Sequence, residues 1–434
     1  MGDPIMTRKL LILCAIAVPL MLAAACGATR GTSGAILIII DALRADHLGC
    51  YGYTRDTSPV LDSLAASGVI FRNCQAQSPW TLPSCATIVS GLSVRSHGTV
   101  TRGRSTYRLD ENMKTLPAVL AEEGFTTGGI VNNPLLSHSI GFADHMDYYR
   151  YYPQGDGRAG ETVDEALEWL RGNAEGSFFL MIHIMDPHAP YSPPAPYDME
   201  YSDVGASAGI GWIMDRDEPG TVLNPEDRDH LVNMYDGEIR WTDRQLGRLF
   251  SGVREMGLSD SLLIIVVADH GEEFLEHGGV DHGHTLYQEL LHVPLIIAGS
   301  SISPGTDVEN NVAQFDIMPT VLDHFGIPIP ADVQGLSLLR EIPLNRELPS
   351  SGLRNVNLAS VLLGKGKVIG DMDTFEYVFY DLDPDPEEHE PVEPDPRAVA
   401  GLEDYWSTPP VFEPPLVDNE AEVQQTLRDL GYIN

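Results

Sequence analysis

Four residues from three distant parts of the chain have side chains suited to holding a divalent cation and attacking an electrophile. Asp41 and the pair Asp269 and His270 directly follow short apolar runs, and carboxylates with an imidazole are common ligands of such a cation. Thr81 precedes Pro83, which fits the first turn of a helix. A hydroxyl at a helix N-terminus faces free backbone N–H groups, which suits a phosphoryl or sulfuryl group. A bound cation would lower the pKa of that hydroxyl and make it nucleophilic.

Each of these residues also has a purely structural interpretation. An aspartate at the end of a strand is commonly a helix cap or a turn residue, and Thr81 taken alone is typical of a helix N-cap. The positions together favour a functional site, because three separate apolar runs all end in Asp or His. Such convergence of ionisable residues is the pattern expected of an active site.

The apolar runs alternate with helical patterns along the chain. The runs are short and β-branched, so they are typical of buried strands. Strands that alternate with helices indicate an α/β fold, in which a mixed, mostly parallel sheet lies between helices. Ligands bind such sheets at the carboxyl ends of the strands, where we expect the Asp and His residues to meet. The predicted strands are 35–40, 178–185, 262–268 and 293–298, and the predicted helices are 58–67, 115–123, 161–171 and 228–255.

Composition restricts the class of partner. The chain has 434 residues and a formal net charge of -36, with 63 acidic and 27 basic residues. This charge excludes nucleic-acid binding through a basic face, and an anionic substrate would be held only where a local cation reverses the field. Hydrophobic residues make up 43% of the chain, which is enough to bury a full core.

The first residues predict export from the cytoplasm. Arg8 and Lys9 precede an apolar run, 10–25, that is short for a membrane span and right for a signal peptide. The run ends at Cys26 in a context that resembles a bacterial lipoprotein box, so residues 1–26 are expected to be a lipoprotein signal. Simple cleavage after the alanines is the alternative. We expect a periplasmic or cell-surface protein, held at the membrane by a lipid anchor if Cys26 is acylated.

The second half of the chain is less regular. Residues 205–225 are rich in Gly, Ser and Asp and are expected to form an inserted loop. Residues 356–382 predict short strands with tight turns, 383–396 predict an acidic, Pro-rich extended segment, and 420–430 predict a short amphipathic helix. We therefore expect a catalytic α/β domain over 35–340, followed by a C-terminal subdomain and acidic tail over 341–434.

Three cysteines remain after the signal, namely Cys50, Cys74 and Cys85. An odd number gives no dense disulfide framework, although one pair is compatible with an oxidising compartment. No Cys/His zinc-finger spacing is present.

Motifs in a fixed order along the chain resemble the sulfatase-like branch of the alkaline phosphatase superfamily. They begin with Asp41 in the stretch Asp-Ala-Leu-Arg-Ala-Asp-His-Leu-Gly and continue with Pro-Trp-Thr-Leu-Pro-Ser around Thr81. The remaining stretches are 57–65, 186–191, 269–274, 276–278, 282–287, 293–296 and 380–386. The resemblance covers residue 36 to the end, and it implies an alkaline-phosphatase-like sheet followed by a small C-terminal antiparallel subdomain.

The resemblance also implies roles for individual residues. Asp41, Asp269 and His270 would bind the catalytic metal, and Thr81 would be the nucleophile and also touch the metal. Two histidines, His188 and His282, would bind the charged oxygens of the substrate, assist the leaving group or hold a second metal. His284 would contribute to substrate binding, whereas His277 fits a structural role.

This chain departs from the sulfatase pattern at three positions. Sulfatases carry Cys or Ser in a Cys-x-Pro-x-Arg motif that is oxidised to formylglycine, but here Thr81 and Cys85 stand at the first and last positions. Threonine cannot become an aldehyde by that route. Ala42 replaces a second aspartate that many sulfatases use for calcium. Fewer carboxylates with a histidine favour zinc or manganese, with calcium or magnesium as alternatives.

The sequence therefore predicts a metal-dependent hydrolase of sulfate or phosphate esters. Thr81 would form a covalent intermediate without formylglycine, and the residue chemistry leans towards phosphoryl transfer. The substrate would be an anionic ester of a small molecule, glycan or lipid. Two alternatives remain at this point: a phosphoethanolamine-type phosphotransferase with the same intermediate, and an inactive sulfatase-like surface lipoprotein that keeps the fold as a binding module.

Overall fold

A computed structural model describes residues 33–103, 105–152, 158–201, 225–299, 302–353 and 356–417. The predicted signal with Cys26, the predicted loop that precedes residue 225 and the predicted helix at 420–430 lie outside these residues. Within the described residues, no helix is both long enough and apolar enough to span a membrane.

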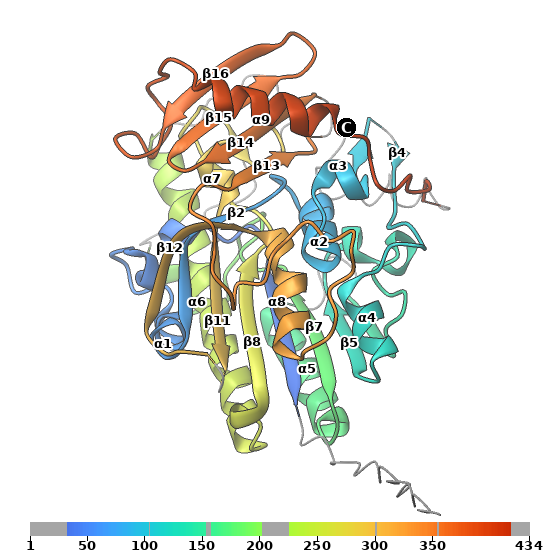
Figure 1. The fold of residues 1–434 in the computed structure, drawn as a ribbon. Helices are drawn as coiled ribbons and strands as arrows, with labels where there is room; N and C mark the ends of the chain where they lie inside the picture. The colour runs from blue at the N-terminus through green and yellow to red at the C-terminus, as the bar shows by residue number, and fades with distance from the viewer. Residues whose placement is uncertain are drawn as a thin grey trace, which may run out of the picture. The chain divides into compact units, whose positions relative to one another are not determined.

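An eight-stranded sheet forms the centre of the protein, in the order β12-β2-β11-β8-β1-β7-β5-β6 (Figure 1). The strand β11 runs antiparallel to both of its neighbours, and the other paired strands of this sheet are parallel. This confirms the predicted mixed, mostly parallel sheet. The strands are β1 (Gly34–Ile40), β2 (Val69–Gln75), β5 (Thr126–Val131), β6 (Tyr148–Tyr151), β7 (Phe178–Ile184), β8 (Leu262–Ala268), β11 (His292–Gly299) and β12 (Thr306–Ala313).

The register of the three middle strands brings their carboxyl ends level with one another. The first strand, β1, lies between β7 and β8, and all seven of its residues are buried. At its carboxyl end, Ile40 is level with Ile184 of β7 and with Ala268 of β8. The residues that follow these strands therefore lie at the same edge of the sheet, which is the arrangement that the apolar runs predicted.

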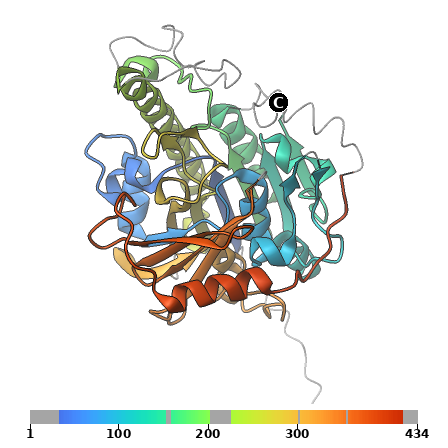
Figure 2. The same cartoon turned by 90° about the horizontal axis from the view of Figure 1, so that it is seen from above.

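Helices cover both faces of the sheet (Figure 2). On one face α2 packs with α4 and α8, and on the other α5 packs with α6. All four predicted helical segments are helices in the structure, whereas the strands β2 and β5 were not predicted from the sequence. The helices around the sheet are α1 (Pro59–Ser67), α2 (Thr81–Ser90), α3 (Val94–His97), α4 (Leu116–Glu122), α5 (Ala159–Asn173), α6 (Pro225–Glu255), α7 (Gln288–Leu291) and α8 (Ile317–His324).

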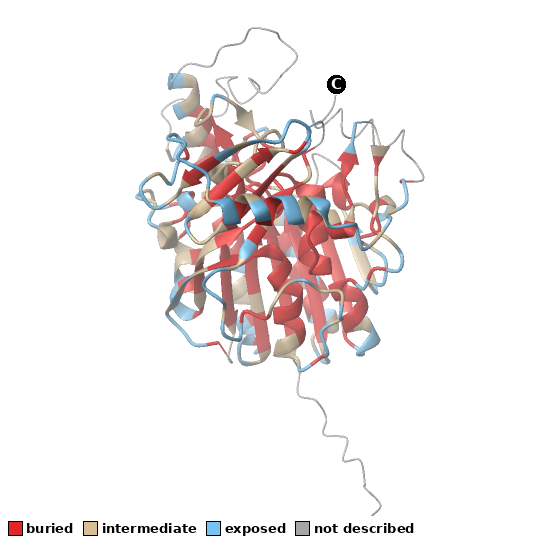
Figure 3. Ribbon diagram, turned by 45° about the horizontal axis from the view of Figure 1, so that its top comes forward, coloured by how far each residue is buried: buried red, intermediate tan, exposed pale blue. Residues whose placement is uncertain are grey.

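A small antiparallel sheet follows, with strands β13 (Glu347–Ser351), β14 (Leu358–Leu363), β15 (Gly366–Asp371) and β16 (Glu376–Asp381). The predicted C-terminal antiparallel sheet is thus present. The helix α9 (Pro396–Ser407), which the sequence did not predict, packs on β14 and β15. Its outer side is exposed, whereas the middle strands of the central sheet are buried (Figure 3). Two short hairpins complete the fold: β3 (Thr101–Arg102) with β4 (Ser105–Thr106), and β9 (Glu273–Phe274) with β10 (Val280–Asp281).

A buried ion pair ties the small sheet to the main body. Lys367 Nζ on β15 lies 2.8 Å from Glu388 Oε1, and the two side chains are 0% and 1% exposed. The other carboxylate oxygen of Glu388 accepts a hydrogen bond from the backbone N–H of Gln288, at 2.6 Å, where α7 begins. The pair therefore connects the C-terminal sheet to the segment that leads into β11.

We expect Lys367→Met to lower the free energy of unfolding by about 3–5 kcal/mol, because it leaves the Glu388 carboxylate buried without its counter-charge. The double variant Lys367→Met with Glu388→Gln removes the charge and keeps an acceptor for Gln288, so it should recover most of that loss. Urea unfolding followed by circular dichroism measures both. Equal stability of the single and double variants would contradict this account.

Candidate active site

The ends of β1 and β8 bring Asp41 and Asp269 together. The Asp41 N–H donates to Ile184 O of β7, at 2.9 Å, which continues the strand register by one residue. Ala42 then turns with a positive φ of 55, and its N–H donates to Asp269 Oδ1 at 3.1 Å. The N–H of His270 donates to the same oxygen at 2.9 Å. The Asp269 carboxylate is therefore fixed by backbone donors, with Oδ2 left facing the cluster.

His270 points its Nε2 at both carboxylates. This atom lies 3.3 Å from Asp41 Oδ1 and 3.5 Å from Asp269 Oδ2, and all three side chains are fully buried. The other ring nitrogen, Nδ1, lies 2.8 Å from Gly271 O, and since that carbonyl only accepts, Nδ1 carries the proton. The Nε2 atom then faces carboxylate oxygens, an arrangement that a cation between them would stabilise.

The charges of the two carboxylates are strongly coupled. Burial acts against ionisation of Asp41, but the imidazoles of His188, His270 and His183 outweigh it and hold the pKa of Asp41 well below its usual range. Burial, together with the negative charge of Asp41, raises the pKa of Asp269 above its usual value. A divalent cation would favour the ionised form of both groups.

Thr81 faces this cluster from the start of α2. Its Oγ1 lies 3.4 Å from His270 Nε2, and it accepts a hydrogen bond from Asn133 Nδ2, also at 3.4 Å. The N-cap of α2 is Trp80, so the interpretation of Thr81 as an N-cap is wrong: the residue is the first of the helix, and its side chain is turned to the strand ends. Pro83 lies in the first turn, as predicted.

Two further residues of the cluster were not predicted from the sequence. Asn133 follows β5 and donates to Asp41 Oδ2 at 2.8 Å. His183 lies within β7, with its Nε2 3.4 Å from Asp41 Oδ2 and 4.0 Å from Asp269 Oδ2. The signal for His183 was present, since it is the one ionisable residue in the apolar run Phe178–Ile184. Asn133 follows a short strand with two glycines, a pattern too weak to predict a strand end.

His282 lies beside His270, and His188 lies beside His282. The ring centroids of His282 and His270 are 4.1 Å apart, and those of His282 and His188 are 5.0 Å apart. His282 Nδ1 lies 2.7 Å from Asp281 Oδ1 and 3.1 Å from Glu272 Oε1. Burial would lower the pKa of His282, but these two carboxylates outweigh it and raise that pKa to about 10. His282 is therefore an imidazolium at neutral pH, whereas burial lowers the pKa of His188.

The remaining histidines of the motif make other contacts. His284 Nε2 lies 2.7 Å from Glu273 Oε2 of the β9–β10 hairpin, and the side chain is 33% exposed. This contact holds His284 to the hairpin and not to the carboxylate cluster. His277 stacks on Tyr287 with ring centroids 3.6 Å apart, and its Nδ1 lies 2.7 Å from Glu289 Oε1. These contacts fit the structural role expected of His277.

Nucleophilic attack by a cysteine is not expected at this site. All three cysteines in the described part of the chain, Cys50, Cys74 and Cys85, are free, so the pair that the sequence left open does not form. Burial, followed by the charges of Asp269 and Asp41, raises the pKa of the Cys85 thiol well above its usual value. Without a cation, Cys85 is therefore a neutral thiol and a poor nucleophile.

The cluster fits a divalent cation. Ligand atoms of Asp41, Asp269 and His270 all lie within 4.8 Å of one another. Asp41 Oδ1 and Asp269 Oδ2 are buried and make no hydrogen bond within the described residues, and such atoms are costly unless something compensates their charge. Two carboxylates, an imidazole and the nearby hydroxyl make a donor set suited to zinc or manganese.

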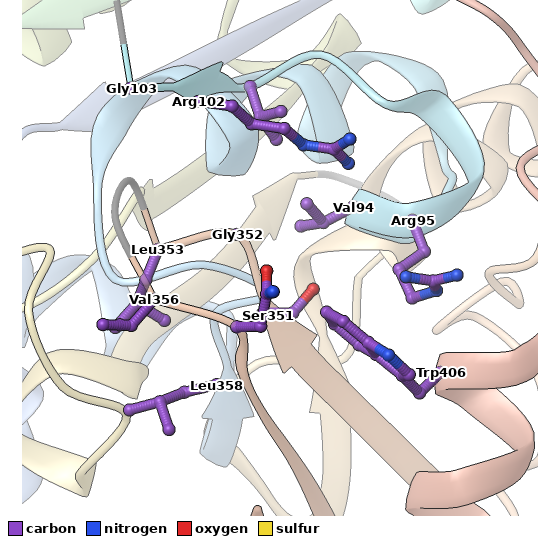
Figure 4. Close-up of a pocket in the computed structure, with 12 residues that line it drawn as sticks. Val94, Arg95, Arg102, Gly103, Ser351, Gly352, Leu353, Val356, Leu358 and Trp406 are labelled. Atoms are coloured by element: carbon purple, nitrogen blue, oxygen red, sulfur yellow. The ribbon is translucent and has the colours of Figure 1, made fainter. Parts of the chain in front are cut away.

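A cavity of about 280 Å³ lies outside this cluster. Arg95, Arg102 and Trp406 line it (Figure 4), and no residue of the carboxylate cluster does. The cavity adjoins the loop that precedes the nucleophile candidate, because the carbonyl of Gly352 in its wall accepts a hydrogen bond from Trp80 Nε1 at 2.7 Å. The buried cluster at the strand ends, and not this cavity, carries the groups able to do chemistry.

Comparison with known proteins identifies the family of this chain. The family model described as Sulfatase matches residues 34–327. An arylsulfatase of Clostridium perfringens is 25% identical over 376 residues, which cover 70% of this chain and 77% of the relative. A Delta 4,5-hexuronate-2-O-sulfatase of Bacteroides thetaiotaomicron is 23% identical over 339 residues, or 70% of each chain. The structure of a phosphonate monoester hydrolase of Agrobacterium radiobacter has the same fold, with a TM-score of 0.71 at 20% identity over 92% of this chain and 95% of that one.

Proposed function

The chain belongs to the sulfatase family and is a sulfuric or phosphoric ester hydrolase, and from this premise we propose that the Thr81 hydroxyl is its nucleophile. One observation carries the proposal: Thr81 Oγ1 lies 3.4 Å from His270 Nε2, in contact with the buried carboxylate cluster. Thr81, Asp41, Asp269 and His270 would act together as one site. A zinc or manganese ion would be held by the three ionisable residues.

The chemistry of threonine favours phosphorus over sulfur in this proposal. An aldehyde hydrate has a second hydroxyl whose collapse can expel a sulfate by breaking a carbon–oxygen bond. Threonine has one hydroxyl, so the group it carries must leave by attack of water at phosphorus or sulfur. This two-step route is the ordinary course of covalent catalysis by a hydroxyl. We therefore propose phosphate or phosphonate esters as preferred substrates, with sulfate esters as the second class.

The side chains have distinct tasks in the proposed reaction. When bound, the divalent cation supplies positive charge that lowers the pKa of the hydroxyl and neutralises the ester oxygens. Thr81 Oγ1 attacks the phosphorus as its proton passes to the neutral imidazole of His188, and the bond to the leaving oxygen breaks. The His282 imidazolium stabilises charge on the non-bridging oxygens, and His188 delivers the proton it has received to the leaving oxygen. Water then hydrolyses the ester on Thr81, and Asn133 keeps both Asp41 and the hydroxyl oriented through its amide N–H group.

A substrate panel tests the class of ester. Purified protein with zinc or manganese is assayed against matched aryl phosphate, aryl phosphodiester, aryl phosphonate and aryl sulfate substrates that share one leaving group. We expect kcat/KM to be highest for a phosphorus ester. A higher value for the sulfate would overturn the preference for phosphorus while leaving Thr81 in place. Product formed only when an alcohol acceptor is present would mark a transferase.

We expect His282→Gln to lower kcat by about 10²- to 10³-fold, which is the usual cost of losing one donor that stabilises developing negative charge. The same variant should raise KM for the anionic substrate, because a positive charge is lost from the site. Steady-state kinetics with the best substrate of the panel measures both effects. Asp281→Asn is the matched control, since Glu272 still faces His282 and the loss should be smaller. Equal losses in the two variants would contradict a direct role of the imidazolium.

A further inference from the structure

A second set of metal-ligand atoms lies beside the carboxylate cluster. We propose that Cys85, His183 and Asp269 bind a further divalent cation of the zinc type, so that Asp269 serves two ions. Ligand atoms of these three residues all lie within 4.8 Å of one another, and all three residues are buried. The site shares Asp269 with the proposed catalytic metal, whereas Cys85 and His183 would be ligands of the second ion alone.

The first support is an imidazole nitrogen without a hydrogen bond. His183 Nε2 is fully buried and makes no hydrogen bond within the described residues. The other ring nitrogen lies 3.3 Å from Asn132 Oδ1, so Nδ1 is the protonated one. The Nε2 atom lies 3.4 Å from Asp41 Oδ2 and 4.0 Å from Asp269 Oδ2. A nitrogen lone pair facing carboxylate oxygens in a dry interior is unfavourable unless a cation lies between them.

The second support is the position of Cys85 on α2. Cys85 follows Thr81 by one helical turn, so the thiol and the hydroxyl lie on the same face of the helix. Cys85 is 1% exposed, and its Sγ lies within 4.8 Å of a carboxylate oxygen of Asp269. Sulfur, nitrogen and oxygen donors together favour zinc over calcium or magnesium. On a tetrahedral zinc ion, ligand atoms lie about 3.5 Å apart, so small side-chain movements would close the site.

The proposed ion also accounts for a departure from the family pattern. Cys85 stands where the motif of sulfatases carries an arginine, so this chain lacks a guanidinium charge next to its nucleophile. A cation bound by Cys85 and His183 would restore positive charge at that place. Binding converts the thiol to a thiolate and releases a proton. The third donor cluster, formed by Glu272, Asp281 and His282, is different, because its carboxylates already face the His282 ring.

Cobalt titration of the metal-free protein tests the second site. A cobalt ion bound to a thiolate has a strong sulfur-to-metal charge-transfer absorption in the near ultraviolet, whereas oxygen and nitrogen ligands give none. We expect wild-type protein to bind two equivalents of cobalt and to show this band. Added zinc should displace the cobalt and remove the band. Cys85→Ser and His183→Ala should each bind one equivalent, and Cys85→Ser should lose the band entirely.

Two controls separate the outcomes. Cys74→Ser removes an equally buried thiol outside the cluster and should keep two equivalents and the band. Far-ultraviolet circular dichroism confirms that each variant is folded. One equivalent without the band in the wild type would overturn the second site and leave the proposed function standing. No cobalt binding at all would overturn both, and a band that persists in Cys85→Ser would exclude Cys85 as a ligand.

Discussion

Thr81→Ala is expected to reduce turnover of the best ester substrate by about 10⁴-fold or more, the size of effect seen when a covalent nucleophile is removed. The physical reason is that the variant loses the attacking atom and has no second nucleophile nearby. Cys85, one helical turn further along α2, does not replace it: without a cation, burial and the charge of Asp269 raise the pKa of this thiol well above its usual value, and with a cation its sulfur would be held as a ligand. The variant should still bind metal through Asp41, Asp269 and His270.

Thr81→Ser is the matched control for this experiment. The variant keeps the hydroxyl and loses one methyl group, which changes packing and not chemistry. Turnover should therefore stay within about tenfold of the wild type. Rapid quenching of the wild type with a phosphorus ester, followed by mass spectrometry, should find the phosphoryl group on the peptide that contains Thr81. Full turnover in Thr81→Ala would remove Thr81 from the mechanism. Turnover lost equally in Thr81→Ser would show that packing, and not the hydroxyl, is essential.

The middle of the sheet could be predicted because it is the most strongly patterned part of the chain. The three runs that became β1, β7 and β8 are buried on both faces, so nearly every residue is apolar. Their common register then places the residues after each run at one edge of the sheet. That is why Asp41 and Asp269 could be expected to meet, although more than two hundred residues separate them in the sequence.

Elements with mixed patterns were missed for a physical reason. The strand β2 carries Arg72 and Asn73 near the edge of the sheet, and β5 contains two glycines, so neither is a continuous apolar run. The helix α9 begins at Pro396, at the end of an acidic and Pro-rich segment that predicted extended structure. Only Ala398, Gly401 and Leu402 of this helix are buried, because it packs on one side of a small sheet.

The contacts of individual polar side chains were harder to predict than the location of the site at the strand ends. The sequence could not indicate that the Asn133 side chain reaches both Asp41 and Thr81, since Asn133 follows a strand that was not expected. It also suggested that Thr81 caps its helix, because the identity of the N-cap depends on where the helix begins, and Trp80 occupies that place. Local propensity could not show whether Trp80 or Thr81 is the N-cap of this helix. The structure places Thr81 inside the helix, where its side chain contacts His270.

Removal of the divalent cation should abolish activity, and the loss should be reversible. After treatment with a chelator, we expect turnover to fall by about 10³-fold or more, because several kcal/mol of charge stabilisation disappear. Added zinc or manganese should restore it, and Asp269→Asn should prevent that restoration by removing one carboxylate charge from the ligand set. Wild-type protein that keeps full activity when metal analysis finds no ion would contradict metal dependence.

Metal affinity should also depend on pH with a defined sign. In the metal-free protein, burial and the charge of Asp41 raise the pKa of Asp269, so a proton competes with the cation for this carboxylate. As the pH falls through the raised pKa, Asp269 takes up a proton and the apparent affinity for the ion decreases; as the pH rises, the affinity increases until the group is fully ionised. Calorimetric titration with manganese at several pH values, in buffers of different ionisation enthalpy, measures the affinity and the released protons. An affinity that does not change with pH would mean that Asp269 is already fully ionised before the cation binds. The conclusion that burial and the charge of Asp41 raise the pKa of Asp269 would then be wrong.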